Sequence, residues 1–389
     1  MKYSKKHIIR WVAVNFCRLF IALVFLASGF IKAVDPLGMS YKINEYLKGV
    51  GILLSYDSLI PLSAAVILSL LESLLGVNLF LGIRRRLTVV SAFVFMLVMT
   101  VVTTYIYIYN PVNDCGCFGD AITLTHQQTL IKNVILLIFS TYVLFENKFI
   151  RRFITERNQW LISTYSFIYI VGLNLYTIHY LPILDFTEYK NNVNLKTAIM
   201  EGKNPKLMGF YLTSIDGLQE HTFDVLTDTN YTFLLTIPEV TTADDGCNDR
   251  INDLYDLCEE NHINFYGVIT SDSLDLADWQ DRTGAAYPFL RGDEMQLRYL
   301  VRSNPGLVVL KDGVIKDKWS NNNLPELNSG IKNIENKNKS PLTRLLFWFV
   351  VPLLVIIFLD AIFDIYKNYK HFILKLFNIK QHEKENCSR

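Results

Sequence analysis

Two thiols stand one residue apart in the segment 113–120, which reads Asn-Asp-Cys-Gly-Cys-Phe-Gly-Asp. A disulfide between Cys115 and Cys117 would close a small, strained ring, and Gly116 supplies the backbone freedom that such a ring needs. Because strain makes a disulfide easier to reduce, the spacing favours thiol–disulfide exchange. Two alternatives stay open: a structural turn with a disulfide or free thiols, and a metal site, which no further Cys or His at suitable spacing supports.

A third thiol, Cys247, follows an apolar run at 231–237 that predicts a strand and precedes a predicted helix at 248–261. A thiol at a helix N-terminus could attack a disulfide or form a mixed disulfide. The alternative is a binding domain with a spare thiol. Cys258 lies eleven residues further on, about 16 Å along a helix, which is beyond disulfide reach. Cys17 and Cys387 are expected to be ordinary reduced cysteines.

Charged residues also occur inside the first two apolar runs. Arg18 and Glu72 are predicted to reach similar depth in two antiparallel helices, and an ionised group there is usually paired or functional. We therefore expect an Arg18–Glu72 ion pair, which either locks helix packing or contributes to a site for a quinone-like cofactor. Lys32, at the outer end of the first helix, is expected to anchor at the interface or to face the same site.

Six apolar segments are long enough to cross a bilayer, which requires about 20 helical residues. They are residues 8–34, 59–83, 87–109, 127–146, 160–183 and 344–366. The chain has 389 residues, 51% of them apolar, and a net charge of +1, so the composition favours the lipid bilayer as a partner and gives no support to nucleic acid. No metal site is predicted.

Basic residues mark every second connection between these segments. By the positive-inside rule this pattern places both termini in the cytoplasm, and the 35–58 loop, the cysteine segment and residues 184–343 outside. We expect a multi-pass protein of the bacterial inner membrane, with a periplasmic domain. The tail at 370–380 mixes Lys with apolar residues, which suits an amphipathic helix on the inner leaflet.

Residues 184–343 are polar, with short apolar strands that alternate with helices, and so predict an α/β sandwich. Strands are expected at 210–212, 231–237, 263–269, 286–290, 306–310 and 314–319, and helices at 248–261, 274–283, 293–302 and 325–335.

The N-terminal third of the chain resembles the DoxX-like membrane family, and the cysteine segment resembles its methylamine-utilisation MauE branch. The resemblance covers about residues 8–146 and rests on Arg18, Gly29 and Lys32, then Glu72, Gly76 and Gly82, and on the Cys-Gly-Cys-Phe-Gly run. It implies a four-helix membrane module linked to periplasmic thiol–disulfide or quinone chemistry. MauE proteins are implicated in maturing a disulfide-rich periplasmic enzyme.

Residues 206–335 resemble thioredoxin-like proteins of the TlpA type. The resemblance rests on Tyr287-Pro288-Phe289-Leu290 and on the run from Ser303 to Gly313, and it implies a cis-proline at Pro305. The chain departs from that family at the active-site position, because Asp244-Asp245-Gly246-Cys247 replaces Cys-x-x-Cys. An ordinary dithiol cycle in this domain is therefore in doubt.

Together these patterns predict a polytopic α-helical membrane protein with an extracytoplasmic thioredoxin-like domain. The expected parts are a four-helix DoxX/MauE-like bundle (1–150), a fifth helix (151–183), a periplasmic domain (184–343) and a sixth helix with a basic tail (344–389). The leading hypothesis is thiol–disulfide exchange, quinone-linked or not, through Cys115, Cys117 and Cys247. The alternative is a non-enzymatic scaffold whose outer domain binds a periplasmic protein partner. A third hypothesis, a transporter for a small solute, is supported only by the buried charges.

Overall fold

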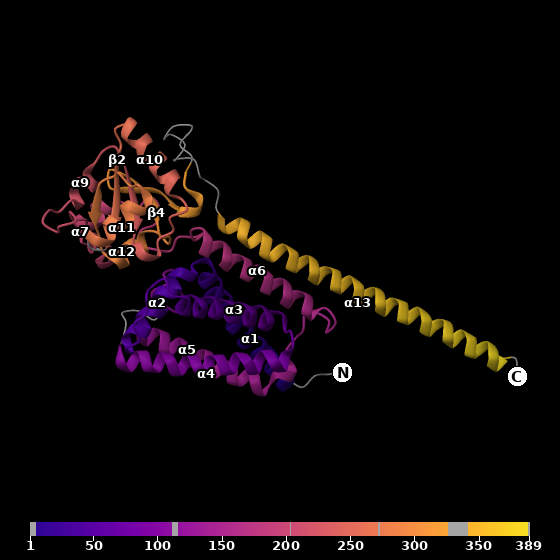
Figure 1. Cartoon of the computed structure of the whole chain (residues 1–389). Helices are drawn as coiled ribbons and strands as arrows, with labels where there is room; N and C mark the ends of the chain where they lie inside the picture. Colours follow the sequence, from indigo (N-terminus) through magenta and orange to yellow (C-terminus); the bar gives the residue numbers. More distant parts are fainter. Residues whose placement is uncertain (1–4, 111–115, 203, 271–272, 326–340, 388–389) are drawn as a thin grey trace.

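A computed structural model describes residues 5–110, 116–202, 204–270, 273–325 and 341–387. It has a bundle of long apolar helices with a separate sheet domain at one end (Figure 1). Six helices are long and apolar enough to span a membrane, which confirms the predicted number. These are α1 (Lys5–Val34), α3 (Leu59–Leu81), α4 (Arg85–Tyr109), α5 (His126–Phe145), α6 (Gln159–His179) and residues Leu342–Lys367 within α13 (Pro341–Cys387).

Helices α1 and α3 form the tightest pair in the bundle because glycines replace side chains where they touch. A Cβ placed on Gly29 would lie 2.6 Å from the backbone nitrogen of Ser73, and one on Gly76 would lie 2.9 Å from that of Leu26. Small residues allow such close approach between membrane helices. The contacts also fix the antiparallel register of α1 against α3.

The segment predicted as the 35–58 loop contains a helix, α2 (Pro36–Gly49). Asp35 caps it by accepting a hydrogen bond from the backbone of Gly38, and proline occupies the first turn, where its missing N–H is not needed. Seven of its residues are buried. The expectation of an open loop was wrong because the helix is short and does not show a strong apolar stripe.

The C-terminal domain is built on a mixed five-stranded sheet in the order β3-β2-β1-β4-β5. Its strands are β1 (Tyr231–Ile237), β2 (Asn264–Ile269), β3 (Phe289–Arg291), β4 (Gly306–Lys311) and β5 (Val314–Ser320). The first three are parallel, and β4 and β5 are antiparallel to their neighbours. The bond between Asn304 and Pro305, just before β4, is cis, as the resemblance implied.

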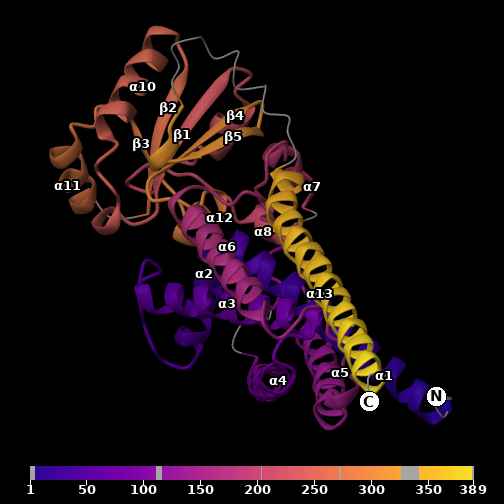
Figure 2. The ribbon, with the colours of Figure 1, turned by 90° about the vertical axis from the view of Figure 1, so that its right-hand side faces the viewer.

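Helices cover both faces of this sheet (Figure 2). Helices α10 (Asn248–Glu260) and α11 (Ser273–Thr283) pack on one face through residues such as Ile251 and Trp279. The other face is covered by α7 (Leu195–Glu201), α8 (Pro205–Met208), α9 (Thr222–Thr227) and α12 (Glu294–Leu300). The period-2 alternation of β1 separates the faces: Phe233 and Leu235 lie in one core, Leu234 in the other.

The predicted α/β sandwich is therefore present, with local differences. Residues 210–212 form no strand; Phe210 and Leu212 are instead buried against α9 and α12. The strand predicted at 286–290 corresponds to β3, which is shorter and begins three residues further along the chain, at Phe289. The helix expected at 325–335 falls almost entirely outside the described residues.

Helix α13 begins near α6 and projects beyond the bundle, so its C-terminal end, like the start of α1, lies on the side away from the sheet domain (Figures 1 and 2). Asp360 holds α13 in place: its carboxylate accepts hydrogen bonds from Thr155 and Asn158 in the connection before α6. The region 370–380, expected to lie on the inner leaflet, continues α13.

Candidate functional site

A buried ion pair lies beneath the cysteine segment, between α1 and α3. The Nζ atom of Lys32 is 2.7 Å from Oε2 of Glu72, and only 2% and 4% of the two residues are exposed. Lys32 is therefore buried, and of its two expected placements it takes the one that faces Glu72. Its ammonium has three donors, and Glu72 takes one.

The other two donors of Lys32 hold the cysteine segment. Nζ donates to the Ser28 hydroxyl at 2.6 Å and to the backbone carbonyl of Cys117 at 2.7 Å. Ser28 Oγ donates to the same carbonyl at 2.8 Å. A charged donor and a neutral donor thus converge on one peptide oxygen, and the backbone at Cys117 is fixed to the membrane helices. Cys115 lies outside the described residues.

The backbone conformation at position 116 and the neighbouring side chain both require a glycine there. Gly116 has φ +59°, a left-handed conformation that side chains disfavour, and a Cβ there would lie 2.6 Å from Cδ of Lys42. Gly116 therefore has a left-handed backbone conformation and lies against Lys42 of α2.

The predicted Arg18–Glu72 ion pair is absent. Arg18 donates to the carbonyl of Arg151 at 2.6 Å, and its Nη1 packs at the position where Gly82 lacks a side chain. Gly82 is ten residues from Glu72, about 15 Å along α3. The predicted pair assumed that the inner ends of α1 and α3 lie level. The contacts of Gly29 and Gly76 instead shift α3 along α1, which places Glu72 beside Lys32.

Arg18, Lys32 and Glu72 consequently do not converge on one quinone-like ligand. Lys32 and Glu72 neutralise each other, Arg18 lies near the far end of α3, and neither of the two described cavities is lined by any of them. The three residues, taken as one set, do not fit a quinone site. Among the described residues, no group of His, Cys, Asp and Glu side chains could hold a metal ion.

Two arginines, Arg298 in α12 and Arg302 two residues after its end, attach the sheet domain to the membrane module. Arg302 lies 2.7 Å from Asp120, in the cysteine segment, and 3.2 Å from Asp35, the cap of α2. Lys42 of α2 lies 3.0 Å from the other oxygen of Asp120. Burial opposes the charge on Arg302, but Asp35 and Asp120 outweigh it and raise its pKa above the ordinary value. The cysteine segment is therefore joined to the sheet domain three residues after Cys117.

Arg298, one turn earlier on α12, makes the second attachment. It binds both oxygens of Asp57, at 2.7 and 3.1 Å, and also Glu239, which follows β1. Burial raises the pKa of Asp57, but the hydrogen bonds and charge of Arg298 outweigh it, and the net pKa is lower than usual. A bidentate arginine–carboxylate pair fixes orientation as well as distance.

These contacts bring the carboxyl ends of the parallel strands towards the membrane module. Glu239 lies just beyond β1 and accepts a hydrogen bond from Ser55, while Thr242 donates to Asp57. The N–H of Asp244 donates to the carbonyl of Asn304, two residues from Arg302. Cys247 follows at the start of α10, so both cysteine-bearing segments are linked to the same interface.

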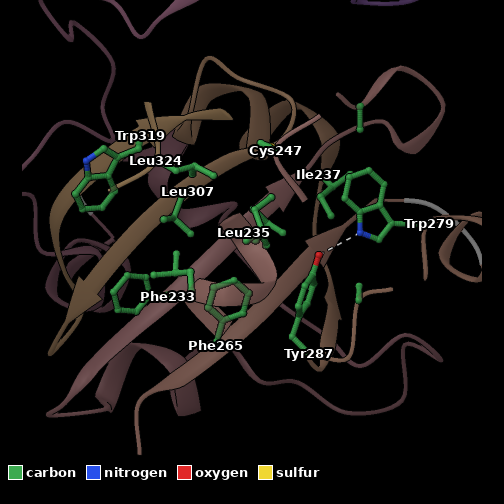
Figure 3. Packing of buried hydrophobic residues seen from close by; sticks show 14 of the residues in the cluster. Phe233, Leu235, Ile237, Cys247, Phe265, Trp279, Tyr287, Leu307, Trp319 and Leu324 are labelled. Atoms are coloured by element: carbon green, nitrogen blue, oxygen red, sulfur yellow. Dashed lines mark hydrogen bonds between the residues drawn. The ribbon is translucent and has the colours of Figure 1, made fainter. Parts of the chain in front are cut away.

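The Cys247 side chain, however, belongs to a hydrophobic core (Figure 3). It is 8% exposed and lies in one cluster with Ile237 and Leu307. Burial, followed by the charge of Asp244, raises its thiol pKa to about 11. Only about one molecule in ten thousand would carry the thiolate at pH 7. Cys258 is fully buried, and burial raises its pKa to about 12.

Sequence reasoning placed the charges of the site in the membrane helices and missed those that dock the sheet domain. These are Asp35, Lys42, Asp57, Asp120, Glu239, Arg298 and Arg302. The available signal was the spacing of Arg298 and Arg302, four residues apart in the helix predicted at 293–302.

Residues 9–146, about a third of the chain, match the family model described as methylamine utilisation protein MauE. The match ends at the close of α5 and includes α1 to α5, the Lys32–Glu72 pair and the cysteine segment. No curated protein and no solved structure matches the chain.

Proposed function

We propose that this protein carries out thiol–disulfide exchange at the outer face of the inner membrane, through Cys115 and Cys117. The observation that carries the proposal is the double anchoring of the cysteine segment. Lys32 and Ser28 hold the carbonyl of Cys117 from below, and Arg302 binds Asp120 from the sheet domain. Positioning of reacting groups on rigid elements is what an exchange site requires.

The exchange is a balanced two-electron step. One thiolate of the pair attacks a disulfide of a partner protein, and the partner's other sulfur leaves as a thiolate. The second thiol of the pair, deprotonated, then attacks the mixed disulfide and releases the partner's remaining sulfur. The partner gains two electrons and two protons, and the membrane pair becomes a disulfide. The reverse sequence oxidises a partner dithiol.

We assign the sheet domain a presenting role in this exchange. Its strand order, the cis bond at Pro305 and the helix after β1 support a thioredoxin-like fold. The position occupied by Cys-x-x-Cys in TlpA-type proteins holds one buried thiol of raised pKa, which argues against a dithiol cycle at Cys247. A domain of this kind would instead bring a partner's cysteines to the Cys115/Cys117 segment.

Trapping of thiols by alkylation, followed by mass spectrometry, tests the proposal on the full chain in membranes. We expect Cys115 and Cys117 to change from a disulfide to alkylated thiols between oxidising and reducing buffers. A Cys117→Ser variant should accumulate a mixed disulfide with a partner through Cys115. If the pair keeps one state across the range of redox potentials, the proposal fails. Cys258→Ser serves as a matched control, because Cys258 is fully buried.

A second candidate is a scaffold or assembly subunit whose outer domain binds a partner without redox chemistry. The burial of Cys247 and the missing second cysteine favour it. A Cys115→Ser/Cys117→Ser variant distinguishes the two candidates. If the protein is a scaffold, the variant should keep its partner and its physiological activity. If the protein carries out thiol–disulfide exchange, the variant should lose that activity.

A further inference from the structure

A cavity of about 1160 Å³ lies away from the cysteine segment, where the sheet domain meets the outer ends of α6 and α13. Its walls are of two kinds. The membrane helices contribute apolar and aromatic residues, among them Ile168, Gly172, Leu345 and Trp348. The sheet domain and the 181–191 connection contribute charged residues, among them Lys318, Asp185 and Lys190.

The cavity extends deep along α6. Helix α6 ends at His179, so Gly172 and Ile168 lie seven and eleven residues below its outer end, about 10 and 16 Å at the helical rise. That depth passes from headgroup level into the hydrocarbon of a bilayer. A ligand that fills the cavity must be polar at one end and apolar at the other.

The polar end carries an excess of positive charge. Arg344, at the start of α13, and Lys190 have no carboxylate partner among the residues that the structure describes. Lys318 is 6% exposed in its side chain and pairs with Asp185 at 2.6 Å. The excess positive charge therefore comes from Lys190 and Arg344, with Lys318 beside them in its ion pair. Asp317 is the one lining carboxylate that makes no ion pair in the described part of the chain.

We propose that this cavity binds a phospholipid of the outer leaflet, with the phosphate near Arg344, Lys190 and Lys318 and an acyl chain along α6 past Gly172. The positive charge at the polar end favours the phosphate, and the apolar residues of α6 and α13 favour the acyl chain. A bound lipid would fill the space between α6, α13 and the sheet domain, and so support the docked position of that domain.

Gly172 offers a sharp test. Gly172 lines the cavity and a Cβ at this position meets no atom within 4 Å, so a side chain there begins in open space. The full chain in detergent micelles is mixed with phosphatidylglycerol that carries a photoreactive diazirine on one acyl chain. We expect cross-links in α6 and in the first turns of α13, reduced at least fivefold in Gly172→Leu. The matched control is Leu175→Phe, on the same helix at a residue that is 63% exposed and does not line the cavity.

A second pair of variants tests the headgroup and does not depend on the helix. Lys190→Ala/Arg344→Ala should weaken competition by short-chain phosphatidylglycerol at least threefold, whereas Lys148→Ala, at the opposite end of the bundle, should not. Competition by inorganic phosphate alone at millimolar concentration would overturn the lipid assignment in favour of a phosphate site. Equal labelling of Gly172→Leu and the unaltered chain, or labelling spread evenly over all helices, would show ordinary surrounding lipid and also overturn it.

Discussion

At the scale of single residues, the most informative feature is the pairing of Lys32 with Glu72. The membrane interior makes an isolated charge expensive, so two charges in adjacent helices are expected to find each other. What the pair adds is a third partner, the carbonyl of Cys117. This ion pair could have served only to pack α1 against α3. It also fixes the position of the Cys117 backbone relative to these two helices.

Removal of one member of this pair should destabilise the bundle strongly. Lys32→Met leaves Glu72 buried without a partner, which costs about 3–5 kcal/mol. Thermal unfolding in detergent should show a large fall in midpoint, and alkylation of Cys117 should become faster as its segment loosens. Ser28→Ala removes the hydrogen bond to the same carbonyl and the one that the hydroxyl accepts from Lys32, and should cost less, about 2 kcal/mol, because both charges keep their partner. Equal effects of the two substitutions would contradict this account.

Cys247 should behave as a buried thiol. Its pKa of about 11 lies about 2.5 units above that of a free cysteine, so its reaction with iodoacetamide at pH 7.5 should be at least ~100-fold slower than that of added glutathione. The rate should rise about tenfold per pH unit up to pH 10. Asp244→Asn removes a charge that raises this pKa and should speed the reaction. A rate that levels off near pH 8 would instead identify an activated thiol.

At the scale of elements, α12 connects the two halves of the protein. Arg298 and Arg302 reach four carboxylates of three other segments, at Asp35, Asp57, Asp120 and Glu239. Both arginine residues are nearly fully buried, at 1% and 3% exposure, so their charges are screened little by solvent.

Substitution of Arg302 should release the sheet domain. Arg302→Ala leaves Asp35 and Asp120 without their shared cation, a loss of about 3–5 kcal/mol for a buried pair. Spin labels on cysteines introduced at Leu53 and Leu218, both highly exposed, should give a narrow distance distribution that broadens in the variant. Arg282→Ala is the control, since its partners Asp245 and Asp278 are more than half exposed. Broadening in both variants would point to general unfolding.

The same docking should resist moderate acid. The pKa of Asp57 is lower in the folded protein than its ordinary value of 3.8, so the stability it contributes is present above that value and lost as pH falls through the folded pKa. Asp185 is shifted in the same direction: burial opposes ionisation, but Lys318 outweighs it. The spin-label distribution should therefore stay unchanged from pH 8 to pH 5 and broaden below about pH 4. Broadening near pH 6 would require another titrating group.

At the scale of the whole molecule, six spans are expected to put both ends of the chain on one side of the membrane and the sheet domain on the other. The positive-inside rule predicts that the side with the basic connections is the cytoplasm. Asp120 and Arg302 are in contact, so the cysteine segment and the sheet domain lie on the same side, which we expect to be the periplasm.

This arrangement can be checked with a membrane-impermeant maleimide on intact cells. In a background without native cysteines, Leu218→Cys on the sheet domain should be labelled from outside. Lys148→Cys, between α5 and α6, should be labelled only after the cells are opened. The reverse pattern would place the exchange site in the cytoplasm and remove its basis.

The sequence alone determined the features that depend on local chemistry: six spans from run length, a sheet domain from alternating apolar strands, and a glycine turn between two cysteines. It also pointed to Arg18 and Glu72 as buried charges, with Lys32 at the interface or facing the same site. It could not determine which of them pair, because that depends on the register of α1 against α3, which Gly29 and Gly76 set by backbone contact. The docking of α12 on Asp35, Asp57 and Asp120 likewise joins residues up to 267 positions apart. Only tertiary packing decides such contacts, since a charged residue in a polar segment looks the same in sequence whether it faces water or a partner.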